Sequence, residues 1–351
     1  MMVAPAVRKE KTAEELKPFS ETVISIVDGL TEKERFTTGD LESLTRSFKR
    51  QTSILSKSPQ QIDANGDHLF TSGRIDALVT GVYTSYNSSD RQTSLKAGEL
   101  VQSIAALCRA SSKTSENSLQ IQPVANGFVR KASGRESFDK HDLHVLNNLL
   151  PFADSLVWPD NLMQRIFVEI WSNDSRFVAG RVLVSMLNSE EYLKRMHDEL
   201  STSGPSKTLS KEDLVVEVIV NKVATTDYNI SLKPISQFVL PGLFETQPRV
   251  IDILLQRASA EVDNPRTLSS AAAIYLWIRV VASARTLSLI NFKDIDSEKL
   301  SISMHHAIDD VRLAAWTALT ACKAPSDRVE LDSLGRVREW FDSNMRVYNA
   351  E

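Results

Sequence analysis

Apolar residues recur at every third or fourth position along almost the whole chain, and this spacing constrains the fold more than any other feature. In the segment AEELKPFSETVISIVDGL, the apolar residues Leu16, Phe19, Val23, Ile26 and Val27 fall on one side of a helix. The strict alternation of apolar and polar residues that marks strands is hard to find. Glycine, which many turns between strands require, contributes only 12 of 351 residues. The sequence therefore predicts an all-α protein.

Helical segments follow one another through short connections. The spacing predicts helices over residues 13–30, 39–55, 69–86, 93–109, 142–152, 161–171, 176–187, 190–200, 210–224, 232–240, 250–260, 267–287, 297–307, 310–322 and 329–345. Pairs of them recur about every 35 to 50 residues, which is typical of HEAT and armadillo repeats. A compact helical bundle is the alternative, but the number of helices is large for one bundle core. We expect a solenoid of antiparallel helix pairs.

A polar linker divides the chain into two halves. The linker covers residues 201–210 and separates N-terminal repeats over 1–200 from C-terminal HEAT-like repeats over 211–351. Ser210 and Asp213 have the spacing of a capping box, which predicts a helix start directly after the linker. Two stretches rich in polar residues, near 56–67 and 111–126, are expected to be flexible loops.

Composition indicates a soluble protein of a reducing compartment. The net charge is −4 and the pI is about 6.0, which argues against a surface covered in Lys and Arg. The longest apolar run is interrupted by Arg279 and is too short to span a membrane. Cys108 and Cys322 are far apart in apolar helical surroundings, where buried free thiols are expected. We predict a cytoplasmic protein without membrane contact.

Residue patterns for catalysis are weak. His141 and His144 lie three residues apart on one helical face, so an enzyme hidden in a helical fold would use them as metal ligands. No further ligand is suitably placed, and a solvated helix start is the favoured interpretation. The motif DANGDHLF has His68 where an EF-hand needs glycine and Arg74 where it needs glutamate. We therefore expect no catalytic residues, cofactor, metal or small-molecule substrate.

One helix carries a row of basic side chains. Arg46, Lys49, Arg50 and Lys57 form a positive stripe beside an apolar face. Such a stripe suits nucleic-acid phosphates, and Arg46, Lys49 and Arg50 are the candidate binding residues. A solvated charged face is the alternative.

The stretch AIDDVRLAAWTAL near the C-terminus has the pattern of a structural repeat. Its two aspartates suit a helix start, and Asp310 lies directly before the apolar positions. Val311, Ala315 and Leu319 are four residues apart and predict one packing ridge. Arg312 lies beside this ridge, where its guanidinium is expected to reach a carboxylate or carbonyl of an adjacent repeat. The pattern D-x-V-R-x-x-A-x-x-x-L resembles the second helix of a HEAT repeat.

The C-terminal third resembles the thyroid adenoma-associated (THADA) family of helical-repeat proteins. The similarity covers residues 225–347 and rests on SMHHAIDDVRLAAWTALTACKAPSDRVELDSLGRVREWFDSNMRV and DYNISLKPISQFVLPGLFETQPRVIDILLQRA. In that family a histidine-containing helix end precedes a VRL-x-A helix, and a short turn leads to a helix with an E-L-x-x-L core. Paired helices of the family also join at a proline turn like the one at Gln247 and Pro248.

The resemblance implies a function without catalysis. Members of this family are partners of a tRNA ribose 2′-O-methyltransferase that acts on the anticodon loop, so the expected partners are that enzyme and tRNA. Family members are usually much longer, and we expect this chain to correspond to an N-terminal fragment of a longer solenoid or to a shortened relative. A general protein–protein interaction scaffold for transport or complex assembly, with no RNA role, stays open as the alternative.

Overall fold

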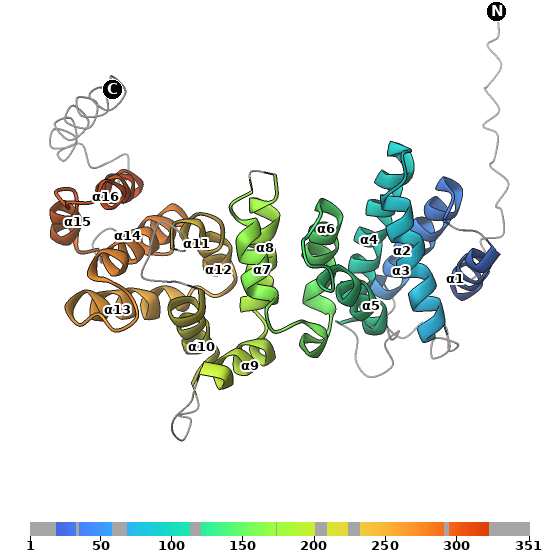
Figure 1. Ribbon diagram of the computed structural model, residues 1–351, viewed down its shortest axis with the longest axis horizontal. Helices are drawn as coiled ribbons and strands as arrows, with labels where there is room; N and C mark the ends of the chain where they lie inside the picture. Colours follow the sequence, from blue (N-terminus) through green and yellow to red (C-terminus); the bar gives the residue numbers. More distant parts are fainter. Residues whose placement is uncertain are drawn as a thin grey trace, which may run out of the picture. The chain divides into compact units, whose positions relative to one another are not determined.

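A computed structural model describes residues 19–32, 35–57, 69–112, 121–172, 174–200, 209–223, 232–290 and 295–322 (Figure 1). Every regular element in these ranges is helical, and no strand occurs among them. The predicted all-α class is therefore confirmed. The chain divides into two compact units, residues 1–192 and 193–351. Within the predicted linker, residues 201–208 lie outside the described part.

The N-terminal unit is built from helix pairs. The pairs are α1 (Phe19–Asp28) with α2 (Thr38–Lys57), α3 (Ser72–Tyr86) with α4 (Arg91–Ser111), α5 (Gln122–Ser133) with α6 (Lys140–Leu149), and α7 (Leu162–Glu169) with α8 (Arg176–Leu187). Short 3₁₀ turns η1 (Gly29–Glu32), η3 (Leu150–Phe152) and η4 (Ser155–Val157) connect some of them. Helix α9 (Glu190–Leu200) follows and spans the boundary between the units.

Equivalent helices of successive pairs lie side by side. The first helices α1, α3 and α5 contact one another in order, and the second helices α2, α4, α6 and α8 do the same (Figure 1). Two layers of helices result, and the apolar core lies between them. This ordered contact pattern is the one that stacked helical repeats produce.

The C-terminal unit is also built from helices, and four of them are only seven residues long. After α10 (Lys211–Glu217) and a π-helical turn, η5 (Val218–Val223), come α11 (Leu232–Phe238), α12 (Leu240–Thr246), α13 (Val250–Asp263), α14 (Ser270–Thr286), α15 (Ser297–Ser303) and α16 (Asp309–Cys322). Helices α13 and α14 pair, as do α15 and α16, and α14 packs directly against α16. Each unit thus shows the helix pairs expected of a HEAT or armadillo protein.

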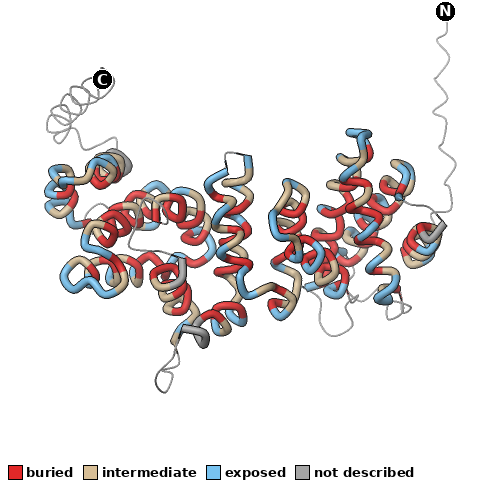
Figure 2. Tube along the Cα trace, in the orientation of Figure 1, coloured by how far each residue is buried: buried red, intermediate tan, exposed pale blue. Residues whose placement is uncertain are grey.

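Burial follows the helical period in both units. Figure 2 shows buried positions where neighbouring helices face each other and exposed positions on the outer turns. In the first repeat, the Phe19 and Phe48 rings meet edge to face with centroids 5.2 Å apart, and Phe70 joins both at 6.5 Å. Among the described helices, none combines the length and the apolar character that crossing a membrane requires.

Local signals explain where several helices begin. The predicted capping box is present: the Ser210 hydroxyl accepts a hydrogen bond from the Asp213 backbone N–H at 3.1 Å, and the Asp213 carboxylate accepts one from the Ser210 backbone N–H. Asp90 caps α4 by accepting hydrogen bonds from the backbone N–H groups of Gln92 and Thr93.

The two predicted loops are shorter than expected. Helix α2 continues to Lys57, α4 continues to Ser111, and α5 begins at Gln122, so parts of the stretches 56–67 and 111–126 are helical. Pro123 explains the early start of α5. Proline is well tolerated in the first turn of a helix, because a backbone N–H at that position would have no hydrogen-bond partner within the helix. Residues 58–68 and 113–120 lie outside the described ranges.

Two glycines allow helices of the N-terminal unit to approach closely. A Cβ at Gly81 of α3 would lie 2.4 Å from a ring carbon of Phe36 and 2.7 Å from a methyl group of Leu30. A Cβ at Gly127 of α5 would lie 2.5 Å from a methyl group of Ile75 in α3. Both distances are far below normal van der Waals contact, so a side chain at either position would force its neighbours to move: Phe36 and Leu30 at Gly81, and α3 at Gly127.

We predict that Gly81→Ala lowers the free energy of unfolding by about 1–3 kcal/mol, as overpacking of a close-packed core usually does. Gly73→Ala is the matched control in the same helix, since no atom lies within 4 Å of its added Cβ. The control is expected to be neutral or to stabilise by about 0.5 kcal/mol through helix propensity. Chemical denaturation followed by circular dichroism measures both. Equal effects of the two substitutions would contradict the close approach at Gly81.

Candidate nucleic-acid interface

Helix α2 presents a row of cations to solvent. The α2 basic row consists of Arg46, Lys49, Arg50 and Lys57, and all four side chains are exposed. The opposite face of α2 is apolar and buried, including Leu41, Leu44, Phe48 and Leu55 at no more than 1% exposure. The predicted positive stripe beside an apolar face is therefore present, with its residues on the solvent side.

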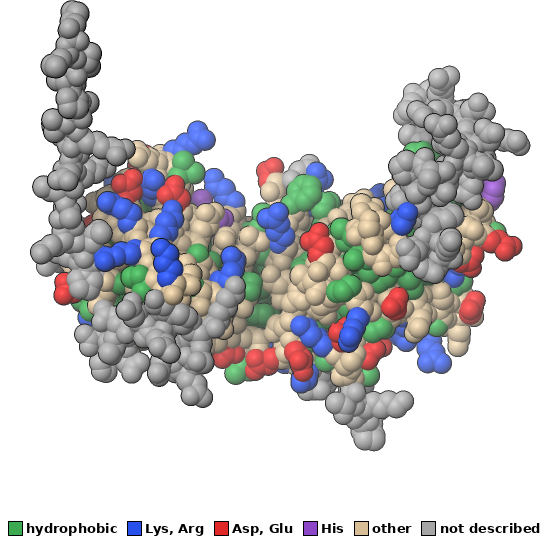
Figure 3. Space-filling model, turned by 180° about the vertical axis from the view of Figure 1, so that it is seen from behind, with side chains coloured by type: hydrophobic (Ala, Val, Ile, Leu, Met, Phe, Trp, Pro, Cys, Tyr) green, Lys and Arg blue, Asp and Glu red, His purple; other side chains and the backbone are tan. Residues whose placement is uncertain are grey.

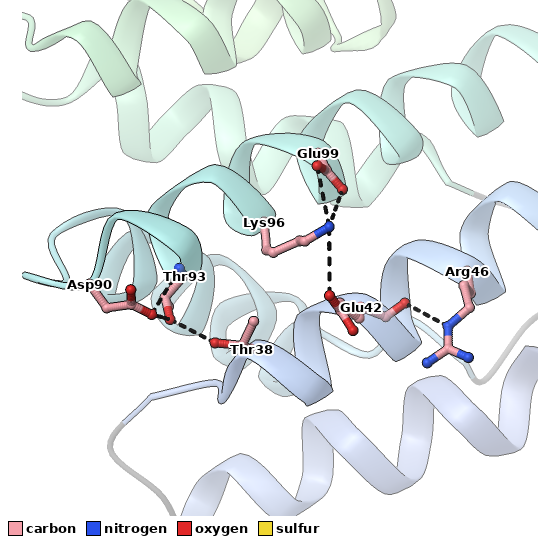
Figure 4. A network of polar contacts seen from close by, with 7 residues as sticks. All are labelled: Thr38, Glu42, Arg46, Asp90, Thr93, Lys96 and Glu99. Atoms are coloured by element: carbon pink, nitrogen blue, oxygen red, sulfur yellow. Dashed lines mark hydrogen bonds and ion pairs between the residues drawn. The ribbon is translucent and has the colours of Figure 1, made fainter.

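The first turns of α2 are tied to α4 by polar contacts (Figure 4). The hydroxyls of Thr38 and Thr93 lie 2.9 Å apart, where α2 and α4 both begin. One turn further along, the Lys96 ammonium lies 3.6 Å from the Glu42 carboxylate and 3.1 Å from that of Glu99. Contacts in the same order along both helices show that α2 and α4 run parallel.

The acidic residues of α2 lie in its first half, and its second half carries only positive charge. Glu42 is the last acidic residue of the helix, and it is paired with Lys96 of α4. From residue 43 to 57 the helix has no Asp or Glu, whereas all four cations of the basic row lie in this part. Seen from behind, Lys and Arg side chains gather over the N-terminal unit (Figure 3). An exposed row of this kind attracts phosphate groups through charge and donates hydrogen bonds to them.

His141 and His144, the two histidines considered as metal ligands, pack against an aromatic ring. The Tyr86 ring of α3 stacks on His141 with centroids 4.3 Å apart and meets His144 edge to face at 6.4 Å. Burial lowers the pKa of both imidazoles below the ordinary value of 6.5, so both are neutral at physiological pH. His141 lies in the first turn of α6, as the predicted helix start requires, but both histidines are half-buried because Tyr86, far away in sequence, packs against them.

The carboxylates beside these histidines are engaged elsewhere. Asp142 is fully buried, closes a capping box with Asp139, and lies 3.3 Å from the Arg135 guanidinium. Burial raises the pKa of Asp142, whereas Arg135 and the backbone N–H of Asp139 act against this rise. No group of three or more His, Cys, Asp or Glu side chains that suits a metal ion occurs in the ranges the structure describes. The cluster organises the start of α6.

Cys108 is a buried free thiol, as predicted, and burial raises its pKa to about 12. A thiol of this kind is not ionised at neutral pH and is a poor nucleophile. The side chain of Cys322 and residues 63–68 of the DANGDHLF motif lie outside the described part of the chain. Arg74 stands where an EF-hand needs glutamate. Its guanidinium donates two hydrogen bonds, of 2.8 and 2.9 Å, to the Asp28 carboxylate.

The predicted structural repeat at the C-terminus forms helix α16. Val311 and Ala315 are fully buried, but Leu319 is only half-buried. Ala314 and Ala318 complete the buried side instead, so the packing ridge follows the three-and-four spacing of a helix and not the constant step of four that was predicted.

Arg312 supports the structure through contacts different from those predicted. Its guanidinium donates hydrogen bonds to the carbonyls of His306 at 2.7 Å and Ala307 at 3.1 Å, and it also pairs with Asp309. The two carbonyls belong to the turn before α16 and Asp309 is the first residue of α16 itself, so all three contacts are local and the expected bond to an adjacent repeat was wrong. The contact with a neighbouring helix is made by Asp310, whose carboxylate lies 3.5 Å from the Lys233 ammonium of α11.

One surface was missed at the level of sequence. Val168 and Trp171, at and just beyond the end of α7, are 66% and 52% exposed. The signal was present, because residues 161–171 are apolar around most of the helix and not along one side. The spacing of these apolar residues predicted a helix with one buried side only.

Comparisons with known proteins add little to this description. No family model matches the sequence, and no curated protein matches it. Among solved structures, the chain is similar to two crystal structures of engineered proteins from the Northeast Structural Genomics Consortium, both at 15% identity. The first has a TM-score of 0.27 and the match covers 86% of this chain and 68% of that protein. The second has a TM-score of 0.25, with coverage of 86% and 96%. Likeness of this degree carries no argument about function.

We predict that Arg312→Ala lowers the melting temperature without altering binding measured on the protein that remains folded. The substitution removes the hydrogen bonds that hold the turn before α16. Because the Arg312 side chain is partly exposed, we expect the free energy of unfolding to fall by only about 1 kcal/mol. Thermal unfolding checks this, with Arg46→Ala on the exposed side of α2 as the control that is expected to have no effect on stability. A melting temperature unchanged by Arg312→Ala would refute the supporting role.

Proposed function

We propose that this chain is a non-catalytic helical-repeat scaffold that binds RNA through the α2 basic row and supports a partner enzyme. The observation that carries the proposal is the exposed second half of α2, where four cations occur with no acidic residue from 43 to 57. The row rises by about 1.5 Å per residue along a helix, so it extends over about 16 Å from Arg46 to Lys57. That length suits several consecutive phosphates of one strand.

The finer form of the proposal comes from the family resemblance. The RNA is tRNA, and the partner is a tRNA ribose 2′-O-methyltransferase that acts on the anticodon loop. In this form, the scaffold supplies phosphate contacts while the partner supplies the chemistry. His141 and His144 pack against the Tyr86 ring, and the buried Cys108 thiol is un-ionised, and both observations agree with the non-catalytic part of the proposal.

A general protein-interaction scaffold is the second candidate. The observation that favours it is the apolar side of α7, where Val168 and Trp171 are exposed. Apolar surface of this kind is typical of protein contacts. The two candidates differ in one measurable property, since only the first requires salt-dependent binding of RNA.

We predict that simultaneous Arg46→Glu, Lys49→Glu and Arg50→Glu weakens tRNA binding by about ten- to a hundredfold at ~0.1 M salt, because three phosphate contacts become repulsive. The dependence of log affinity on log salt is expected to fall in slope by about 2–3. Fluorescence anisotropy with labelled tRNA over a salt series measures both quantities.

The matched control changes the same amount of charge elsewhere. Arg181, Arg249 and Arg266 are exposed and lie outside α2, so their triple reversal to Glu is expected to leave most of the affinity intact. Equal losses in both triple variants would mean that only overall charge matters. Absence of salt-dependent tRNA binding by the wild-type chain would favour the protein-scaffold alternative.

We also predict that the purified chain transfers no methyl group alone but raises ribose methylation of the tRNA anticodon loop when it is added to the methyltransferase. Mass spectrometry of tRNA nucleosides from a strain lacking the chain is expected to show loss of that 2′-O-methyl group. The α2 triple variant is expected to restore methylation less well than the wild type. Unchanged modification after deletion would reject the methyltransferase partnership and leave the RNA-binding result to be judged separately.

A further inference from the structure

The α2 basic row has a serine at its centre. Ser53 is exposed and lies three residues after Arg50 and four residues before Lys57. At about 100° per residue, its side chain leaves the helix between those of Lys49 and Arg50. Side chains three or four positions apart on a helix are neighbours, with Cβ atoms about 5–6 Å apart. Lys49, Arg50 and Lys57 are therefore all neighbours of the Ser53 hydroxyl.

Ser53 differs from the other hydroxyl side chains near the end of α2. The Thr52 hydroxyl donates a hydrogen bond of 2.9 Å to the Phe48 carbonyl, and the Ser56 hydroxyl donates one of 2.9 Å to the Thr52 carbonyl. Thr52 is also half-buried, whereas Ser53 is exposed on the same side as the cations. Ser53 is thus the hydroxyl that the basic row presents to solvent.

The residues before Ser53 form a pattern that protein kinases recognise. Arg50 and Lys49 stand three and four positions before this serine. Kinases select substrates partly by charge, and an acidic substrate groove binds basic residues that precede the acceptor. Ser56 has Ser53 and Thr52 at the equivalent positions, so it lacks the pattern.

The last turns of α2 can open to bring Ser53 into a kinase active site. Helix α2 ends at Lys57, and helix ends open locally at a low cost in free energy. From residue 52 to residue 57, only Leu55 is buried. Opening of this segment therefore exposes one large apolar side chain and leaves the buried side of the first half of α2 in place.

A phosphate on Ser53 would cancel much of the charge of the basic row. A phosphoserine carries about −1.5 to −2 charges at neutral pH, and it would stand among the four cations of the row. Residues 43–57 contain no Asp or Glu, so it would be the only negative side chain in this part of the helix. Its oxygens would accept charge-assisted hydrogen bonds from Arg50 and Lys57, and these donors would then be lost to RNA phosphates.

We infer that Ser53 is a phosphorylation site and that its modification by a protein kinase switches off RNA binding by the α2 basic row. This inference rests on the proposed function, because it needs the row to bind RNA. In the reaction, the Ser53 Oγ attacks the γ-phosphorus of ATP, the bond from that phosphorus to the β–γ bridging oxygen breaks, and ADP leaves. The hydroxyl proton passes to the catalytic aspartate of the kinase.

The first experiment asks whether Ser53 accepts phosphate in the folded full chain. The probe is the catalytic subunit of cAMP-dependent protein kinase, which selects serines preceded by basic residues, together with ATP and Mg²⁺. Tandem mass spectrometry is expected to place phosphate on Ser53, and Ser53→Ala is expected to lose most of the incorporated phosphate. Absence of phosphate from Ser53, or phosphate mainly on other residues, would overturn the inference.

The second experiment places phosphoserine at position 53 by genetic-code expansion and measures tRNA binding by fluorescence anisotropy. We expect the affinity to fall at least about tenfold at ~0.1 M salt, and the salt slope to fall by about 2, because about two of the row's positive charges are neutralised. Phosphoserine at position 56 is the matched control, since it adds the same charge to the same helix without a cation three or four residues before it. This control is expected to weaken binding by less than about threefold.

Circular dichroism checks that both phosphorylated chains keep their helical content, because negative charge near a helix C-terminus is unfavourable. If phosphoserine at position 53 unfolds the chain, Ser53→Asp is measured in its place. This variant adds one negative charge and is expected to weaken tRNA binding about threefold.

The outcomes separate this inference from the proposed function. Absence of salt-dependent tRNA binding by the unmodified chain would reject the proposed function, and the switch with it. Salt-dependent binding that phosphoserine at position 53 weakens no more than phosphoserine at position 56 would reject the switch and leave the proposed function standing.

Discussion

The parallel packing of α2 along α4 is the contact on which the N-terminal unit depends. Leu41, Leu44 and Phe48 are completely buried on one side of α2, so that side is committed to the core. The Thr38–Thr93 contact fixes where the two helices start relative to each other. Once this alignment is set, α4 contacts α6 and α6 contacts α8 in the same layer, and the first helices of the pairs fill the second layer. Stacking of neighbours in this way buries apolar surface that no single pair can bury alone.

The same packing determines which part of α2 is available for binding. A helix with one buried side must turn its polar residues outward, and in α2 these include Arg46, Lys49 and Arg50. Lys96 of α4 lies against Glu42 and compensates the acidic first half of the helix. The second half is left with positive charge on its exposed side. The proposed RNA contact is thus a consequence of helix alignment, and it requires neither a cleft nor a pocket.

Contacts close in sequence were predictable, and contacts between distant residues were not. The helical period predicted the class of fold, and the spacing of Ser210 and Asp213 predicted a helix start, because each signal is contained in one turn of the chain. The stacking of His141 on Tyr86 joins two helices, and no pattern within either helix indicates it. Arg312 is an exception: its supporting role was predicted, but its guanidinium bonds local carbonyls and not the adjacent repeat, because the turn before α16 brings the His306 and Ala307 carbonyls within reach.

The α2 basic row and the exposed apolar side of α7 differ in chemistry, so the two proposed functions differ in their expected dependence on salt. The row gains affinity by releasing counterions from phosphates, so its binding weakens steeply with salt. The exposed apolar side of α7 contains Val168 and Trp171, so the proposed protein contact there would depend on removing apolar surface from water and would change little with salt. Each surface is built from the outward side of one helix, and neither needs the other for its geometry. In a scaffold made of stacked helix pairs, each repeat contributes one exposed side without disturbing the core that it shares with its neighbours.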